Sequence, residues 1–261
     1  MNGITPFSQK PYIIPHRDTV LWRYMDFAKF LSLLQTKSLY FRRADKLDDP
    51  FEGAKCRIED KPAYEKSHID ELRKRAQSEA SFNDREKRGF EKFLLENEKL
   101  GLPFSRQNFI NCWHENEYES VAMWNLYTTS LEYGVAIKTT YEKLCTSLEN
   151  VDDIQIGRVT YRDLNINNPI NEDDVFWYKL NPYKHEQEVR AIIEDLNPAL
   201  QEDGELIIEK LIPIKLNHLI EEVYLSPSSK LWFKELVKNV MEKYGLIKEI
   251  KQSDLKNVPY R

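Results

Sequence analysis

The pattern of apolar and polar residues at the amino-terminal end predicts a strand, a helix and a second strand. Val20–Tyr24 is expected to form the first strand, and Asp26 is expected to cap the helix that follows. The apolar residues of that helix recur at helical spacing: Phe27, Phe30, Leu31 and Leu34. Ser38–Arg42 then forms a short strand, and the loop Asp45–Gly53 has the Asp, Pro and Gly content of a rigid turn.

Strands and helices alternate again in the second part of the chain. Further strands are expected at 107–113, 133–139, 154–161, 186–194, 205–212, 221–226 and 246–251. Further helices are expected at 119–130, 140–148 and 228–244, the last capped by Ser228 or Ser229. Between the two parts, residues 60–103 are highly charged with few apolar positions, which predicts a peripheral helical insertion. We therefore expect one α+β domain spanning residues 1–261.

Composition restricts the class of protein. The 261 residues are 41% apolar and 31% charged, with a net charge of −5, so the chain can bury a core and offers no long basic tract to nucleic acid. No apolar run approaches the ~20 residues that cross a bilayer, and no signal peptide precedes the first strand, so we expect a cytoplasmic protein without a membrane partner. Cys56, Cys112 and Cys145 are expected to be free thiols.

Several common enzyme motifs are absent from the sequence. The eight glycines form neither GxGxxG nor a P-loop, and HExxH and GxSxG do not occur. A functional site must therefore be assembled by the fold from separate segments.

The segment His185–Ile193 is the first candidate for such a site. If it is a regular strand, Glu186, Glu188 and Arg190 share one face and the apolar residues take the other. Two neighbouring carboxylates repel each other unless a cation or a ligand separates them. The alternative is a solvated face on which Arg190 offsets two surface acids.

Asn111–Ser120 and Arg23 are the other candidates. The first segment places Trp113, His114 and three carboxylates at a strand end, where functional residues collect, although Glu119 or Ser120 could simply cap the next helix. The spacing of His114 and its acidic neighbours is weak evidence for a metal, and we assign no metal site. Arg23 lies in an apolar strand, so its guanidinium must either reach solvent or meet an anion, which could be a ligand phosphate or an acid such as Asp49 or Glu52.

Several segments of residues 18–255 together resemble a bacterial domain family of unknown function whose members often lie near abortive-infection and other antiphage genes. They are LWRYMDFAKFLSLLQTKSLYFRRADKLDDPFEG, FINCWHENEYESVAMWNLYTTSLEYGVAIKTT, GRVTYRD, YKLNPYKHEQEVRAII and LIEEVYLSP. The resemblance implies a role in antiviral defence and a possible partner protein from the same defence system.

The order of these segments is also distantly similar to ADP-ribosyltransferases of the Arg–Ser–Glu type. This likeness implies a mixed, mainly antiparallel central sheet with flanking helices, and NAD as substrate. Glu188 would stabilise an oxocarbenium-like transition state, Glu186 would orient a macromolecular acceptor, and Arg23 would hold the pyrophosphate. Further cofactor contacts would come from the residues around them: Tyr24, Tyr40, Asn111, Trp113, His114 and Arg190. Asn111-Cys112-Trp113 stands where that superfamily has Ser-Thr-Ser.

Two alternatives to a transferase stay open. The same polar residues could form a non-catalytic sensor or binding module. Asp48, Asp49, Glu186 and Glu188 could instead hold Mg²⁺ in a nuclease, with Lys179 or Arg190 stabilising the reacting phosphate.

The transferase hypothesis makes two predictions, one about the structure and one about a mutation. It requires Arg23, Trp113 and Glu188 to lie around one cleft, and Arg23 on the opposite side of the sheet from Glu188 would contradict it. It also predicts that Glu188→Gln abolishes activity and leaves folding nearly unchanged.

Overall fold

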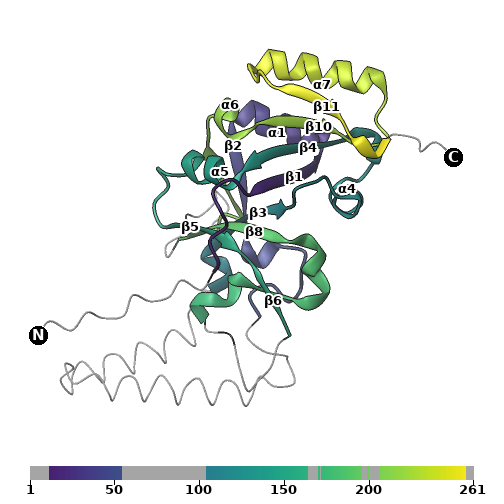
Figure 1. Ribbon diagram of the computed structural model, residues 1–261. Helices are drawn as coiled ribbons and strands as arrows, with labels where there is room; N and C mark the ends of the chain where they lie inside the picture. Colours follow the sequence, from purple (N-terminus) through teal and green to yellow (C-terminus); the bar gives the residue numbers. More distant parts are fainter. Residues whose placement is uncertain are drawn as a thin grey trace, which may run out of the picture.

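The computed structural model describes residues 12–54, 104–163, 170, 172–195, 199 and 206–256 (Figure 1). The insertion predicted at 60–103 lies outside these residues. The described chain forms strands and helices in the alternation expected from the sequence.

The first unit follows its predicted pattern closely. Strand β1 (Val20–Asp26), helix α1 (Phe27–Thr36) and strand β2 (Ser38–Arg43) come in direct succession, and α1 buries Phe30 and Leu34. Asp26 occupies the N-cap position of α1, but its side chain makes no capping bond. Its carboxylate instead accepts a 2.7 Å hydrogen bond from the backbone of Thr129, so the predicted cap is wrong.

The remaining elements are as follows. The strands are β3 (Asn108–Glu115), β4 (Gly134–Thr140), β5 (Ile154–Arg158), β6 (Thr160–Arg162), β7 (Tyr178–Leu180), β8 (Glu188–Glu194), β9 (Glu209–Pro213), β10 (Glu222–Leu225) and β11 (Glu249–Gln252). The α-helices are α4 (Val121–Tyr127), α5 (Tyr141–Ser147), α6 (Leu216–Leu219) and α7 (Leu231–Tyr244). Short 3₁₀ turns are η1 (Ala44–Lys46), η3 (Phe104–Arg106), η4 (Leu131–Tyr133), η5 (Glu172–Trp177), η6 (Asn181–Glu186) and η7 (Asp254–Lys256).

Several predicted boundaries differ from those in the structure. The strand expected at 154–161 divides into β5 and β6. Helix α7 begins after Lys230, and neither predicted serine caps it, because the Ser229 hydroxyl donates to the Ser226 carbonyl.

Nine strands of the described residues form one sheet in the order β11-β10-β4-β1-β3-β2-β9, with β8 added to β3 and β5 added to β8. Within this sheet, all pairs except β10–β11 are antiparallel. A separate parallel pair joins β6 to β7. The predicted α+β class with a mixed, mainly antiparallel sheet is confirmed.

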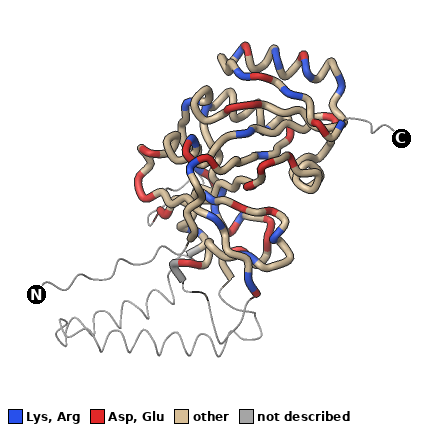
Figure 2. Tube along the Cα trace, in the orientation of Figure 1, with Lys and Arg blue, Asp and Glu red and all other residues tan. Residues whose placement is uncertain are grey.

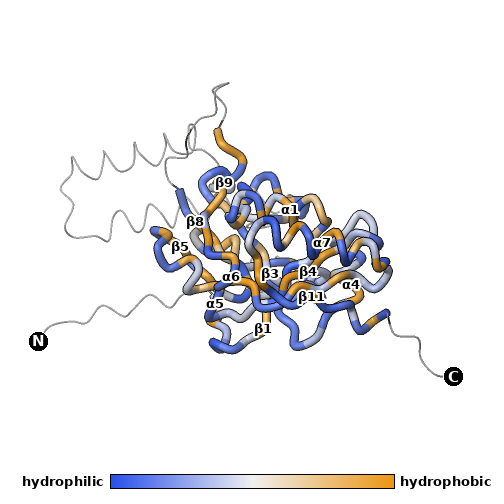
Figure 3. The backbone as a smooth tube through the Cα atoms, turned by 90° about the horizontal axis from the view of Figure 1, so that it is seen from above, coloured by the Kyte–Doolittle hydropathy of each residue, from blue (hydrophilic) through white to orange (hydrophobic). Residues whose placement is uncertain are grey.

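The two faces of the sheet are covered differently. The face that carries Leu21, Trp113 and Val189, here called the core face, packs against α1, α5, α6 and α7 in the largest hydrophobic cluster. The opposite face, here called the second face, is covered by α4 over β1 and by η5 over β3 and β8. Figure 3 shows the hydrophobic stretches of strand running through the middle of the molecule.

The sheet divides along the middle of β3. One edge of β3 pairs with β8 from Asn108 to His114. Its other edge pairs with β2 only at Phe109 and Ile110, and with β1 only at His114 and Glu115. The backbone of Asn111–Trp113 therefore lies between two strands that separate from each other. We call this place the strand fork.

Candidate functional site

Strand register assigns each predicted site residue to a face. Trp22 lies opposite His114, and His114 lies opposite Glu188, so these three side chains share the second face. Arg23 lies opposite Ile137, a residue of the largest hydrophobic cluster, and therefore starts on the core face. The strand register contradicts the prediction that Arg23, Trp113 and Glu188 lie around one cleft. The side chain of Arg23 leaves β1 on the face of the sheet opposite Glu188.

The other candidates divide in the same way. Asn111 and Trp113 start on the core face with Arg23. Tyr24 and Arg190 start on the second face, because alternation places Tyr24 with Trp22 and Arg190 with Glu188. The sequence-derived constellation is thus split between two sides of one sheet.

Glu186 does not lie on a strand. It ends η6, and Gln187 follows in the left-handed region with φ 40° and ψ 56°. Strand β8 begins only at Glu188, so the prediction that Glu186, Glu188 and Arg190 share a strand face is wrong for Glu186. The left-handed residue turns the chain and brings the Glu186 carboxylate beside Lys179 instead.

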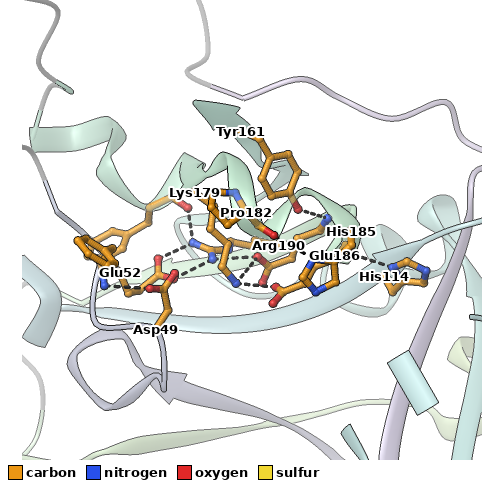
Figure 4. Close-up of polar contacts among 12 residues, drawn as sticks. Asp49, Glu52, His114, Tyr161, Lys179, Pro182, His185, Glu186 and Arg190 are labelled. Atoms are coloured by element: carbon orange, nitrogen blue, oxygen red, sulfur yellow. Dashed lines mark hydrogen bonds and ion pairs between the residues drawn. The ribbon is translucent and has the colours of Figure 1, made fainter. Parts of the chain in front are cut away.

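Five charged side chains form a buried network around β8 (Figure 4). Arg190 donates to both oxygens of Glu52, at 2.5 and 2.8 Å, and to Glu188 at 2.9 Å. Lys179 donates to Glu186 at 2.5 Å and lies 3.6 Å from Glu188. The side chains of Glu188 and Arg190 are only 5% and 1% exposed, so the alternative of a solvated strand face is wrong.

The network keeps the Glu188 carboxylate ionised. Burial alone would raise its pKa, but Arg190 and Lys179 outweigh burial and lower the pKa from 4.5 to about 2. Burial and the negative charge of the same carboxylate raise the pKa of the Cys112 thiol well above its usual value. Glu188 is therefore a fixed negative charge whose contacts are already supplied by the protein.

Glu52 is a member of the network that sequence reasoning assigned differently. It was a candidate partner for Arg23, but the structure pairs it with Arg190 across 138 positions of sequence. Burial raises the pKa of Glu52 against the opposing effect of Arg190. Gly53 follows with φ +73°, and a Cβ there would lie 2.8 Å from the Phe176 ring, so the turn requires glycine.

Hydrogen bonds to the backbone hold the turn between the two glutamates. The imidazole Nδ1 of His114 lies 2.6 Å from the Glu186 carbonyl, and the Glu115 amide donates to the Gln187 carbonyl at 2.8 Å. The Glu188 amide donates to the Tyr161 hydroxyl at 2.8 Å. Because a carbonyl only accepts, His114 carries its proton on Nδ1, and burial lowers its pKa.

The guanidinium of Arg23 has few hydrogen-bond partners. Its guanidinium lies 5.7 Å from the centre of the Trp113 ring, and Nη2 makes a long 3.5 Å contact with the Tyr40 carbonyl. The Nη1 atom is buried and has no hydrogen-bond partner among the described residues. Burial lowers the pKa of Arg23 to about 10, so it stays cationic at neutral pH, and no acid of the described chain forms an ion pair with it.

Asn111 and Trp113 support this side of the strand fork. The Asn111 amide donates to the Tyr40 carbonyl at 2.8 Å, and the Trp113 indole donates to the Asn111 oxygen at 2.7 Å. Trp113 and Tyr24 are buried, and the Tyr24 hydroxyl accepts a bond from the Ser120 amide. Neither ring is free to stack on a ligand, so the expected cofactor contacts of these two aromatic residues are not supported.

Arg23 and Glu188 nevertheless approach the same two side chains. Charge–charge interaction couples Arg23 to Cys112 and Tyr127, and it couples Glu188 to the same pair. Tyr127 ends α4 and keeps part of its surface exposed, while burial and the nearby Glu186 raise the pKa of its hydroxyl. Tyr127 is not among the site residues expected from the sequence, because helical spacing alone does not show which residue ends a short helix beside another element.

The helix-capping alternative for Asn111–Ser120 holds for part of that segment. The Ser120 hydroxyl accepts a bond from the Met123 amide and caps α4. The Glu119 carboxylate accepts bonds from the Trp124 indole at 2.9 Å and from the Asp254 amide at 2.7 Å. These two residues therefore have structural roles.

The four acids proposed for a metal-dependent nuclease do not form one cluster, because Asp48 lies apart from the buried network. The Asp48 side chain is 95% exposed and pairs with Arg42, whereas Glu186 and Glu188 lie in the buried network. Within the described ranges, no group of three or more His, Cys, Asp or Glu residues could hold a metal ion. Cys112 and Cys145 are free cysteines, as predicted, and Cys56 lies outside the described ranges.

A scan against protein-family models and a search of curated proteins found no match for the chain. In the part of the chain with described coordinates, no helix combines the length and the apolar character needed to span a membrane. Acidic and basic residues are interspersed along the described chain (Figure 2). The proposal for the function therefore rests on the geometry of the site.

Proposed function

We propose that the protein is a binding module for a phosphate-bearing ligand, and that Arg23 at the strand fork is its anion contact. The observation that carries this proposal is the buried Nη1 atom of Arg23, which has no partner among the described residues. An unpaired buried donor on a cation is costly, and proteins rarely retain one without a compensating interaction. A ligand oxygen would supply that interaction.

The chemistry of Arg23 favours phosphate over a neutral group. A guanidinium presents several donors in one plane and binds phosphate oxygens through paired hydrogen bonds. Among the described residues, Glu52 and Glu188 are both occupied by Arg190, so neither neutralises Arg23. Partial burial strengthens the attraction for a second charge, because less water screens it.

A second candidate function is NAD-dependent ADP-ribosyl transfer, although the placement of Arg23 and Glu188 on opposite faces of the sheet counts against it. The observation in its favour is that ionised Glu188 and cationic Arg23 approach the same pair, Cys112 and Tyr127. Glu188 would stabilise the oxocarbenium-like state and Glu186 would orient a macromolecular acceptor, with a defence-system protein as partner. The ligand would have to reach a carboxylate that Arg190 and Lys179 contact in the structure, so binding without cleavage ranks first.

Titration calorimetry with inorganic pyrophosphate and with NAD⁺ tests both functions. We expect binding of both ligands to the unmodified protein and its loss in Arg23→Met, which keeps an unbranched apolar side chain but removes the guanidinium. Arg17→Met is the matched control, because Arg17 is an exposed arginine that pairs with Glu142. Absence of binding by the unmodified protein would overturn the proposal.

Nicotinamide release separates the two functions. NAD⁺ that binds and stays intact after long incubation supports the binding module. Nicotinamide release that disappears in Glu188→Gln would favour the transferase, provided that the variant is shown to be folded by its thermal midpoint.

A further inference from the structure

Two exposed apolar side chains lie side by side near the strand fork. Tyr40 on β2 is 39% exposed and Leu211 on β9 is 46% exposed. The two residues are direct partners in the β2–β9 pair, so they stand on the same face of the sheet. β9 is the last strand on this side of the sheet, and nothing in the described chain covers the pair enough to bury it.

This surface belongs to the second face of the sheet. On β2, Leu39 and Phe41 point into the largest hydrophobic cluster, which places Tyr40 on the other side. Arg42 lies on that side too, opposite Ile110 of the second-face cluster. The Tyr40 ring therefore shares a face with Glu188.

Burial raises the pKa of the Tyr40 hydroxyl, and so does Glu209, which lies on β9 two positions before Leu211. The Tyr40 ring and Leu211 together form an apolar platform.

Tyr40, the aromatic residue of the platform, is also the residue whose carbonyl Arg23 contacts. Nη2 of Arg23 approaches the Tyr40 carbonyl at 3.5 Å, and the Asn111 amide donates to the same oxygen at 2.8 Å. The Arg23 guanidinium and the exposed ring are therefore linked through one residue of β2, because the guanidinium approaches the carbonyl of Tyr40 and the ring is the side chain of the same residue. Such a pairing of a cation with an exposed aromatic surface fits a ligand that has a charged end and a flat apolar end.

We propose that the Tyr40–Leu211 platform receives the heteroaromatic base of a nucleotide whose phosphates lie on Arg23. This inference rests on the proposed function and narrows its ligand class from phosphate compounds to nucleotides. Every nucleobase has a flat face that stacks on an aromatic ring, and such stacking is tolerant of base identity.

The test compares ADP with inorganic pyrophosphate by titration calorimetry. Base–aromatic stacking should make ADP bind about 5- to 150-fold more tightly than pyrophosphate. Tyr40→Leu should remove most of this difference and leave pyrophosphate affinity unchanged, whereas Tyr40→Phe should retain it. Leu211→Asp, on the opposing strand, should also weaken ADP selectively. Tyr118→Leu is the control, because Tyr118 is exposed elsewhere.

The outcomes distinguish this inference from the proposed function. One outcome would rule out the platform as a base-binding surface but support Arg23 as the anion contact. In that outcome ADP and pyrophosphate bind equally well, Tyr40→Leu changes neither affinity, and Arg23→Met loses both. Binding of neither ligand would overturn both. A preference for ADP that Tyr40→Leu and Leu211→Asp abolish, and Tyr118→Leu retains, would support the platform.

Discussion

Arg23 and Glu188 leave opposite faces of the sheet, yet both lie within electrostatic range of Cys112 and Tyr127. The strand fork makes this arrangement possible, because β1 and β2 separate along the middle of β3. The two charges differ in how they are satisfied. Glu188 is held by protein cations, whereas a nitrogen of Arg23 has no described partner.

Arg23→Met should leave the protein as stable as the unmodified chain or stabilise it by about 1–2 kcal/mol, because it removes an incompletely paired buried cation. Urea unfolding monitored by circular dichroism measures the change. A loss of stability of more than about 2 kcal/mol would show that Arg23 serves the fold and would weaken its assignment to a ligand.

Arg190→Met, unlike Arg23→Met, should lower the stability of the protein. It leaves the Glu52 and Glu188 carboxylates buried without their shared cation, which should cost about 3–5 kcal/mol of unfolding free energy. Arg17→Met removes an exposed pair with Glu142 and should cost at most about 1 kcal/mol. Similar urea midpoints for the two variants would contradict the buried network.

Glu188→Gln should destabilise the fold by about 3 kcal/mol at neutral pH, since the pKa falls from 4.5 to about 2 on folding and one pKa unit corresponds to about 1.4 kcal/mol. This differs from the sequence-based expectation that folding is nearly unchanged, because the carboxylate is buried between two cations. Loss of activity in this variant therefore needs a parallel measurement of stability.

The pH dependence of Glu188→Gln provides a second measurement. A lowered folded-state pKa means that the unfolded chain binds more protons, so this contribution is present above pH 4.5 and is lost as the pH falls toward about 2. The difference in unfolding free energy between the unmodified protein and Glu188→Gln should shrink across that window. A difference that stays constant down to pH 2 would mean that Glu188 is not held ionised.

Tyr161→Phe should cost about 1–3 kcal/mol, because it leaves the buried Glu188 amide without its acceptor at the start of β8. Tyr118→Phe removes an exposed hydroxyl and serves as the control. Hydrogen exchange of the Glu188 amide should also accelerate in Tyr161→Phe. Unchanged hydrogen exchange and unchanged stability would show that Tyr161 does not stabilise the turn before β8.

Local patterns predicted the elements of this fold well. The 3.6-residue spacing of Phe30 and Leu34 identified α1, and alternation identified most strands, because both patterns arise from the face that each element buries. The boundary errors at Glu186 and Ser229 have local causes that hydrophobicity does not report. A left-handed Gln187 and a serine bonded back to Ser226 each end or delay an element.

The pairing of elements was not predictable in the same way. Single-strand alternation placed Glu188 with Arg190 correctly, but it could not show that Arg190 meets Glu52 from a loop far away in sequence. It also could not show that β1 and β2 occupy different parts of one edge of β3, which creates the fork beside Arg23. Such relationships depend on strand order, which a single sequence does not record.

The most direct test of the central claim is a crystal structure of the unmodified protein soaked with ADP. The account predicts phosphate oxygens within hydrogen-bond distance of Nη1 of Arg23 at the strand fork, with the base against Tyr40. A structure in which ADP occupies another site, or in which Nη1 stays without a ligand partner at saturating ADP, would contradict it.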